Sequence, residues 1–357
     1  MRTDLDFSLT PFLVIWEVTR ACALACRHCR AKAIDERDPR ELTLEMGKLL
    51  LRDIATMQTP IVIFTGGDPL QRDDLEDLIA HGKSLGLRVG TIPAATPRLT
   101  KERLASLGKA GIDQIALSLD ATTAEAHDRL RKVDGSFART MQGAKWVREL
   151  GIPLQINTTV GAWNYEEFDG MIELVESLGI VFWEVFFLVP TGRGAKLEGC
   201  TARQYEELFA KLYTLSLRAP FIIKITEAPH YRRYVMQHSP APGTTPPAAQ
   251  PHTGQRSMAG LSPLPVNAGK GFCFVDHIGE VYPSGFLPVS AGNIRRASII
   301  DIYRTTPLFN AMRTPHRLKG RCGRCEYREV CGGSRSRAYA VTRDYLEEDP
   351  CCGYQPK

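Results

Sequence analysis

The sequence predicts an α/β protein, a partial (β/α)6 barrel of the TIM type followed by a small cysteine-rich C-terminal domain. Short apolar, β-branched runs alternate with segments of helical periodicity along the first two thirds of the chain, as is typical of parallel βα units. The ten cysteines lie in two groups, at residues 22–29 and 273–352, with only Cys200 between them. These two patterns divide the chain into a barrel and a metal-binding appendage.

Six apolar runs are the expected strands, and they occupy residues 12–18, 61–65, 87–92, 112–119, 152–160 and 181–189. Helix-start signals lie between them: Thr43 precedes an amphipathic segment, and Thr122 with Glu125 and Asn164 with Glu167 form cap-like pairs. The expected helices end at glycines, namely Gly86, Gly111, Gly151 and Gly179. A βα array of this kind forms a parallel sheet with its chemistry at the C-terminal strand ends.

A further helix at residues 202–217 and a strand at 221–226 follow, so the barrel is predicted to span residues 1–235. A proline-rich segment is expected at 236–270, because residues 239–265 hold seven prolines. It is either a solvated linker or a lid over bound substrate. The third region, residues 271–357, has little apolar sequence, so a bound metal would have to help it fold.

Composition excludes several classes of protein. With 357 residues, 43% of them hydrophobic, the chain is long enough to bury a core and is not disordered. The net charge of +5 is scattered, so no nucleic-acid partner is expected. The N-terminus does not resemble a signal peptide, and no apolar run approaches the roughly 20 residues of a membrane helix. We therefore expect a cytoplasmic protein without a membrane partner, where clustered cysteines favour metal ligation over disulfides.

The first cysteine group reads Cys22-x3-Cys26-x2-Cys29 and directly follows the first expected strand. Three thiolates on one loop can hold three irons of a [4Fe–4S] cluster and leave the fourth iron open. A zinc site or coincidence is the alternative. The arrangement resembles the radical S-adenosylmethionine (radical SAM) superfamily over residues 11–229. That resemblance implies that the open iron chelates S-adenosylmethionine, which one electron cleaves to a 5′-deoxyadenosyl radical that abstracts a substrate hydrogen.

Residues after the second expected strand extend the resemblance. Gly66, Gly67 and Asp68 resemble the family's GGEP-type motif, with Asp in place of the commoner Glu, and the motif implies contact with the methionine amino group. An ordinary turn is the alternative reading.

Family position implies further contacts to S-adenosylmethionine. His28 would pack near the adenine, and Val189 would lie in its backbone platform. Arg129 would pair with the carboxylate, for which a guanidinium is suited. Three more side chains would contact the ribose or methionine groups: Ser118, Asp120 and Asn157. For Arg129 and these three, a strand-end hydrogen bond or a surface ion pair remains the alternative. No catalytic side chain beyond the cluster and cofactor is assigned.

The second cysteine group reads Cys322-x2-Cys325-x5-Cys331 and is completed by Cys351 or Cys352. Spacing alone does not separate a zinc ribbon from an iron–sulfur site. The run resembles the SPASM or twitch-like extension of radical SAM enzymes, which implies one auxiliary [4Fe–4S] cluster. Its expected ligands are Cys322, Cys325, Cys331 and Cys352.

A second auxiliary cluster would lack ligands, since Ser284 and Arg335 stand where that extension has cysteines. Cys273 is then a leftover or partial ligand, and Cys200 a structural thiol.

The resemblance implies a radical SAM enzyme that modifies a haem-like tetrapyrrole, for example by decarboxylating its propionate side chains. Residues 334–340 favour this branch, with Arg335 and Arg337 as receptors of substrate carboxylates. A maturase of ribosomal peptides or peptide-derived cofactors is the alternative. A catalytically silent iron–sulfur or zinc protein is the non-enzyme alternative. The expected electron donor is of the flavodoxin or ferredoxin type.

Overall fold

The computed structural model describes residues 5–239 and 264–357. The prediction of a linker or lid falls mainly on residues 240–263, which lie outside the described residues. Seven parallel strands pair in chain order: β1 (Leu13–Thr19), β2 (Ile61–Gly66), β3 (Arg88–Thr91), β4 (Gln114–Ser118), β5 (Leu154–Val160), β6 (Phe182–Phe187) and β7 (Ile222–Thr226). Strand β7 is an edge that does not pair with β1, so the barrel is open, as expected for a partial barrel.

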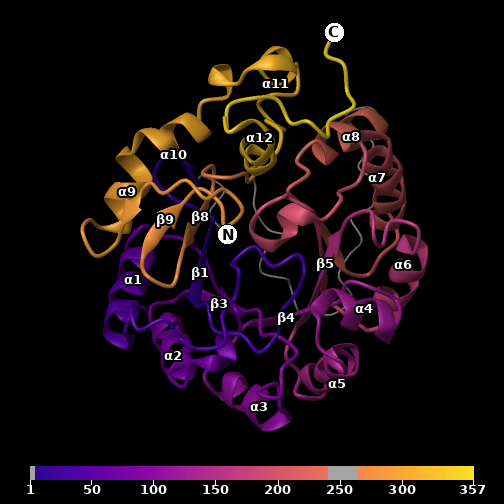
Figure 1. Ribbon diagram of the computed structural model, residues 1–357. Helices are drawn as coiled ribbons and strands as arrows, with labels where there is room; N and C mark the ends of the chain where they lie inside the picture. Colours follow the sequence, from indigo (N-terminus) through magenta and orange to yellow (C-terminus); the bar gives the residue numbers. More distant parts are fainter. Residues whose placement is uncertain (1–4, 240–263) are drawn as a thin grey trace.

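Helices cover the outside of this sheet (Figure 1). They are α1 (Leu44–Thr56), α2 (Leu75–Ser84), α3 (Lys101–Lys109), α4 (Ala124–Arg131), α5 (Ser136–Glu149), α6 (Phe168–Ser177), α7 (Ala202–Ser216) and α8 (Tyr231–His238). Thr43 caps α1 as predicted, by accepting from the N–H of Met46. The predicted helix-ending glycines adopt positive φ, from 63° at Gly179 to 95° at Gly111.

Two of the cap predictions are wrong. Thr123, not Thr122, caps α4, while Thr122 donates to Glu167 at 3.0 Å. Adjacent threonines cannot be separated by spacing, because either one fits the capping pattern. Asn164 does not cap α6; its amide donates to the carbonyls of Asp120 and Thr159, both at 2.9 Å. It therefore joins the ends of two strands.

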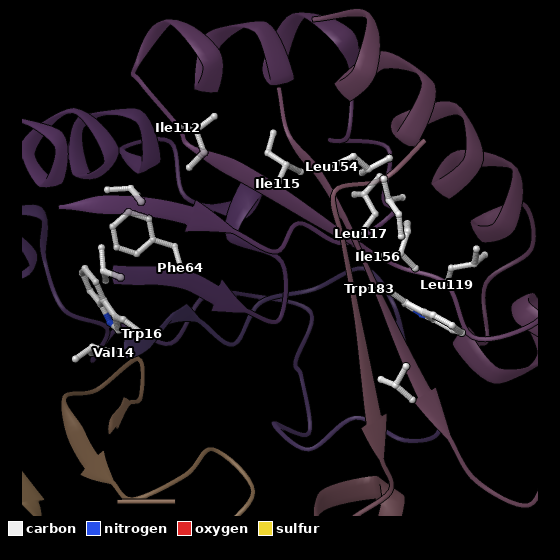
Figure 2. Close-up of a cluster of buried hydrophobic side chains, with 14 of the residues drawn as sticks. Val14, Trp16, Phe64, Ile112, Ile115, Leu117, Leu119, Leu154, Ile156 and Trp183 are labelled. Atoms are coloured by element: carbon white, nitrogen blue, oxygen red, sulfur yellow. The ribbon is translucent and has the colours of Figure 1, made fainter. Parts of the chain in front are cut away.

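The core lies between the sheet and the helices, because alternate strand residues point outward. Figure 2 shows Trp16 and Phe64 side by side, and their rings meet edge to face with centroids 5.7 Å apart. Leu117 and Ile156 lie in another part of the same cluster, and both are almost fully buried. The inward-facing residues of the same strands line the interior of the barrel.

The C-terminal region begins with a strand that joins the barrel sheet. Its elements are β8 (Phe272–Val275), β9 (Glu280–Tyr282), β10 (Gly292–Asn293), α9 (Ile299–Thr305), α10 (Pro307–Met312), α11 (Gly320–Arg324) and α12 (Arg335–Thr342). Strand β8 runs parallel to β1, with Cys273 opposite Val14. The predicted division at residue 271 therefore falls within one continuous sheet. Among the described helices, none combines the length and the apolar composition needed to cross a membrane.

Candidate functional sites at the two cysteine groups

The first cysteine group lies on the loop between β1 and α1. Every thiol of the group accepts a hydrogen bond: Leu24 N–H donates to Cys22 Sγ (3.3 Å), Ala33 N–H to Cys29 Sγ (3.5 Å) and Arg131 Nη1 to Cys26 Sγ (3.6 Å). Burial raises the pKa of Cys22 to about 12 and also raises that of Cys26. Thiolates at these positions therefore need a bound positive charge, which a metal cluster provides.

The Gly66-Gly67 turn packs directly on this loop. A Cβ on Gly66 would lie 2.5 Å from the Thr19 carbonyl oxygen, and one on Gly67 would lie 2.4 Å from that of Ala21. Gly67 N–H also donates to the Thr19 carbonyl at 2.8 Å. Only glycine allows two strand ends to approach this closely.

Asp68 stabilises the turn from behind. Its carboxylate accepts from Thr96 Oγ1 (2.7 Å) and from the N–H groups of Ala94 and Leu70, both at 3.2 Å. The side chain is fully buried and does not line the barrel cavity, and burial raises its pKa. Asp68 thus ties the end of β2 to the segment after β3.

A third segment, which the sequence reading missed, covers the loop from the side of β6. Gly192 has φ +59°, and a Cβ there would lie 2.5 Å from the Cys29 carbonyl oxygen. Arg193 N–H donates to that carbonyl at 2.9 Å, and Arg193 Nε donates to the Cys26 carbonyl at 2.8 Å. No motif signalled this contact, since 167 residues separate Arg193 from Cys26.

The prediction for Arg129 is corrected. Its side chain is 64% exposed and lies 3.6 Å from Glu125, one turn earlier on α4. Arg131, two residues further on, is buried instead and pairs with Asp120. Residues i and i+2 of a helix face different sides, which is the physical reason for the difference. Burial alone would raise the pKa of Asp120, but the Arg131 guanidinium beside it lowers that pKa below its usual range.

A cavity of about 290 Å³ opens beside the first cysteine group. The predicted contact residues that line it are His28, Gly66, Gly67, Ser118, Asn157 and Val189. Asp68 and Asp120 do not line it. Asp68 accepts a hydrogen bond from Thr96, and Asp120 accepts one from Arg131. Arg131 also lines the cavity, and the sequence reading missed it. The sequence does not show which face of α4 is buried, so spacing along this helix does not distinguish Arg131 from Arg129.

The polar wall of this cavity is a continuous network on β5–β7. Gln155 Nε2 donates to Asn157 Oδ1 (2.6 Å) and to Glu184 Oε2 (3.0 Å). Glu184 Oε1 in turn accepts from Thr226 Oγ1 (2.6 Å) and pairs with Lys224 at 3.1 Å. The interior of the barrel is therefore polar and hydrogen-bonded on this side.

The second cysteine group surrounds a separate cavity of about 30 Å³. The four predicted ligands line it: Cys322, Cys325, Cys331 and Cys352. Asp349 N–H donates to Cys322 Sγ and Gly333 N–H to Cys331 Sγ, both at 3.4 Å. Cys351 does not line this cavity; the Arg337 guanidinium and a hydrogen bond from the Tyr205 hydroxyl both act to lower the pKa of its thiol, which burial raises. This placement favours Cys352 over Cys351.

His230 also lines the smaller cavity and was missed by the sequence reading. The side chain is 1% exposed, and neither of its ring nitrogens has a hydrogen-bond partner. Burial lowers its pKa to about 4, so the ring is neutral at pH 7.

Arg335 and Arg337 do not receive substrate carboxylates, contrary to prediction, because both are buried in the fold. Arg335 donates to the carbonyls of Tyr345 (2.9 Å) and Glu347 (2.6 Å) and to Cys322 Sγ (3.7 Å). Arg337 pairs with Asp349 at 3.2 Å. Both side chains are buried on α12, where their guanidinium groups bond to carbonyls of the fold.

The other positions of the missing second auxiliary cluster also have structural roles. Cys273 is fully buried in β8, so it packs in the core. Ser284 Oγ donates to Glu227 Oε1 at 3.1 Å. Cys200 is buried in the core as well, in agreement with a structural thiol.

In the part of the chain that the structure describes, no three His, Cys, Asp or Glu side chains are arranged to hold a single metal ion. The residues present nevertheless fit iron–sulfur clusters in their chemistry. Both sites present cysteine thiols that accept N–H···S hydrogen bonds, which is the usual environment of such clusters. The first site has three thiols beside a cavity of about 290 Å³, and the second has four thiols around a cavity of about 30 Å³.

Known proteins are similar to this chain over its whole length. Residues 16–175 match the model of the radical SAM superfamily. The chain is 40% identical to an AdoMet-dependent heme synthase of Methanosarcina barkeri, covering 97% of both chains. It is 39% identical to the enzyme of that name from Oleidesulfovibrio alaskensis, covering all of this chain and 90% of the relative.

Among solved structures, SuiB of Streptococcus suis bound to S-adenosylmethionine has the same fold, with a TM-score of 0.71 at 16% identity, over 97% of this chain and 78% of SuiB. Its low identity supports the fold alone. The full-length identity to the synthases, together with the three-cysteine loop, establishes the family. This chain belongs to the radical SAM superfamily, whose members use a [4Fe–4S] cluster and S-adenosylmethionine.

Proposed function

We propose that this radical SAM enzyme modifies the propionate side chains of a haem-like tetrapyrrole. The observation that carries the proposal is the identity of about 40% to AdoMet-dependent heme synthases over nearly the whole chain. The aligned residues include both the barrel and the C-terminal region.

The walls of the large cavity suit such a substrate. One wall is apolar and comes from β1, β2 and β8, with Leu13, Ile63 and Phe272 among its residues. The opposite wall is the polar network with Glu184 and Lys224. A tetrapyrrole has a flat apolar ring and charged carboxylates at its edge, so it needs both kinds of surface.

The residues of the barrel hold the reacting groups. Cys22, Cys26 and Cys29 would ligate one cluster, and Gly66, Gly67 and the Arg131–Asp120 pair would shape the surface around its open side. When bound, that [4Fe–4S] cluster supplies the electron that cleaves S-adenosylmethionine to methionine and a 5′-deoxyadenosyl radical. Ser118, Asn157, His28 and Val189 line the cavity in which the cofactor would be oriented. Burial keeps His28 neutral by lowering its pKa to about 4.

The proposed reaction balances as an oxidative decarboxylation. The cavity would hold the propionate carbon beside the ring, from which the radical supplied by the bound cofactor would take one hydrogen atom. The carboxylate would then leave as carbon dioxide, one electron would pass to an oxidised one-electron carrier of the iron–sulfur or flavin class, and a vinyl group would remain. Cys322, Cys325, Cys331 and Cys352 would hold the auxiliary [4Fe–4S] cluster. We also propose a flavodoxin- or ferredoxin-type electron donor and a cytoplasmic location.

The experiment is anaerobic incubation of the reconstituted, reduced protein with S-adenosylmethionine and an iron porphyrin that carries propionates. We expect 5′-deoxyadenosine together with a porphyrin that has lost carbon dioxide and two hydrogen atoms per reacting side chain, measured by mass spectrometry. The porphyrin methyl ester is the matched control and should not react. Formation of 5′-deoxyadenosine with an unchanged porphyrin, but with a modified peptide from cell extract, would instead support a peptide maturase.

A further inference from the structure

The cavity of about 290 Å³ is lined by four permanently charged cations in the described part of the chain. Three are paired with buried or half-buried carboxylates: Arg30 with Glu17 at 2.9 Å, Lys224 with Glu184 at 3.1 Å, and Arg131 with Asp120. The fourth, Arg232 on α8, makes no ion pair with any described residue.

Two backbone carbonyls hold the Arg232 guanidinium in place. Nη1 donates to the Val330 carbonyl at 3.0 Å, and Nη2 donates to the Val266 carbonyl. A guanidinium has five N–H groups, so three are left after these two bonds. The side chain is therefore anchored in one position while it retains donors for a ligand.

The surroundings of Arg232 favour the binding of an anion. A half-buried cation without a carboxylate partner is unfavourable, and carbonyl dipoles together with the charge of the Cys331 thiol compensate it only in part. Burial lowers the pKa of Arg232, in contrast to Arg131, whose pKa the nearby Asp120 helps to raise. A carboxylate in the cavity would supply the missing charge and accept two parallel N–H bonds.

We propose that Arg232 binds a propionate carboxylate of the substrate. The inference rests on the proposed function and deepens it, because it assigns the residue that orients the tetrapyrrole. Val330 is the neighbour of Cys331, so the carbonyl that holds Arg232 belongs to the auxiliary cluster loop. A carboxylate on Arg232 would accordingly lie at the side of the cavity nearest to that loop.

A rival role for Arg232 is to neutralise the auxiliary cluster alone. The bonding pattern argues against this as its sole role: the Cys331 thiol acts on Arg232 only through its charge, whereas Arg335 donates to a thiol of the group, at 3.7 Å from Cys322 Sγ. Arg232 donates to carbonyls instead. Arg232 also lines the large cavity, which Arg335 does not.

The test is a titration of the reconstituted protein with an iron porphyrin in the free-acid and the methyl-ester form, followed by its absorption spectrum. Wild type should bind the acid more tightly. Arg232→Met should raise the Kd of the acid roughly ten- to hundredfold, the loss of one charge-assisted interaction, and leave that of the ester nearly unchanged. Arg232→Lys should restore part of the affinity. Arg203→Met, an exposed position on α7, is the matched control.

The outcomes separate the two proposals. If Arg232→Met keeps the acid-to-ester ratio of wild type, Arg232 does not bind the carboxylate, even if the reduction potential of the auxiliary cluster shifts. If wild type binds neither porphyrin form, the tetrapyrrole proposal itself is wrong. Iron content and thermal unfolding of each variant show whether it has folded, and if Arg232→Met fails to fold, the Arg232→Lys titration decides.

Discussion

The two cysteine groups of this protein are held by different sets of hydrogen bonds. The loop with Cys22, Cys26 and Cys29 is fixed by segments far away in the sequence, since Gly67 and Arg193 bond to its backbone from the ends of β2 and β6. The group around Cys322 and Cys331 combines bonds within residues 319–352 with bonds from earlier segments, since Asn267 donates to the Cys331 carbonyl and Arg232 to that of Val330.

The two sites also differ in the number of thiols and in the cavity beside them. The first site has three thiols and opens onto a cavity of about 290 Å³, whereas the second has four thiols around about 30 Å³. A cluster iron without a protein ligand can bind a substrate or cofactor, and one with full ligation cannot. We therefore expect the first site to carry the reactive iron and the second to hold a fully ligated cluster.

The largest expected effect comes from removing one ligand at each site. Cys26→Ala should abolish formation of 5′-deoxyadenosine, because the open iron is lost with the cluster. Cys325→Ala should still form 5′-deoxyadenosine but no porphyrin product. Chromatography of the nucleoside measures both. Equal loss of the nucleoside in the two variants would remove the distinction between the sites.

Iron content sharpens the same comparison. Two [4Fe–4S] clusters predict about eight irons per chain. Cys352→Ala should reduce the count to about four, whereas Cys351→Ala should keep about eight, because Cys351 lies outside the small cavity. A wild-type content of about four irons with one zinc would instead favour a zinc ribbon at the second site.

Arg131 tests how strongly the first site depends on the barrel. Arg131→Met leaves Asp120 buried without its partner, and breaking such a pair costs about 3–5 kcal/mol of folding free energy. The Tm should fall, and the first cluster should be lost before the second. Arg129→Met, on the exposed face of the same helix, should change stability by less than about 1 kcal/mol. Similar Tm values for the two variants would contradict the assignment.

Substituting single glycines near each cysteine group should produce the smallest difference in stability between the two sites. Gly333 has φ +66°, and a Cβ there would lie 3.0 Å from Cys322 Sγ, so Gly333→Ala should cost about 1–2 kcal/mol and weaken only the second cluster. Gly67→Ala, 2.4 Å from a carbonyl oxygen, should weaken only the first. Gly199→Ala meets no atom within 4 Å and is the control. Thermal unfolding and iron content measure all three.

Local pattern in the sequence predicted most of the barrel. Runs such as residues 112–119 and 152–160 contain β4 and β5, because a strand buried on both faces needs continuous apolar sequence. Thr43 and the helix-ending glycines mark real boundaries, since caps depend on neighbouring residues alone. The cysteine spacing likewise predicted the family, which the similarity to known radical SAM proteins confirms.

Tertiary structure decided the charged positions. The sequence offers Arg129 and Arg131 on one helix, and only packing shows that the second is buried beside Asp120. In the sequence, Arg335 and Arg337 are plausible binding residues for a carboxylate. In the fold both are buried on α12, where Arg335 donates to carbonyls and Arg337 pairs with Asp349.

The same limit applies to the cysteines and to Arg232. The sequence alone makes Cys273 and Cys352 equally good candidate ligands. In the fold, Cys273 lies in the core on β8, whereas Cys352 lines the cavity of about 30 Å³ near the end of the chain. Arg232 stands out only when every cation of the large cavity has been matched to its carboxylate. Periodicity reports which residues are apolar over short distances, whereas the partner of a charge is set by segments that meet only when the chain has folded.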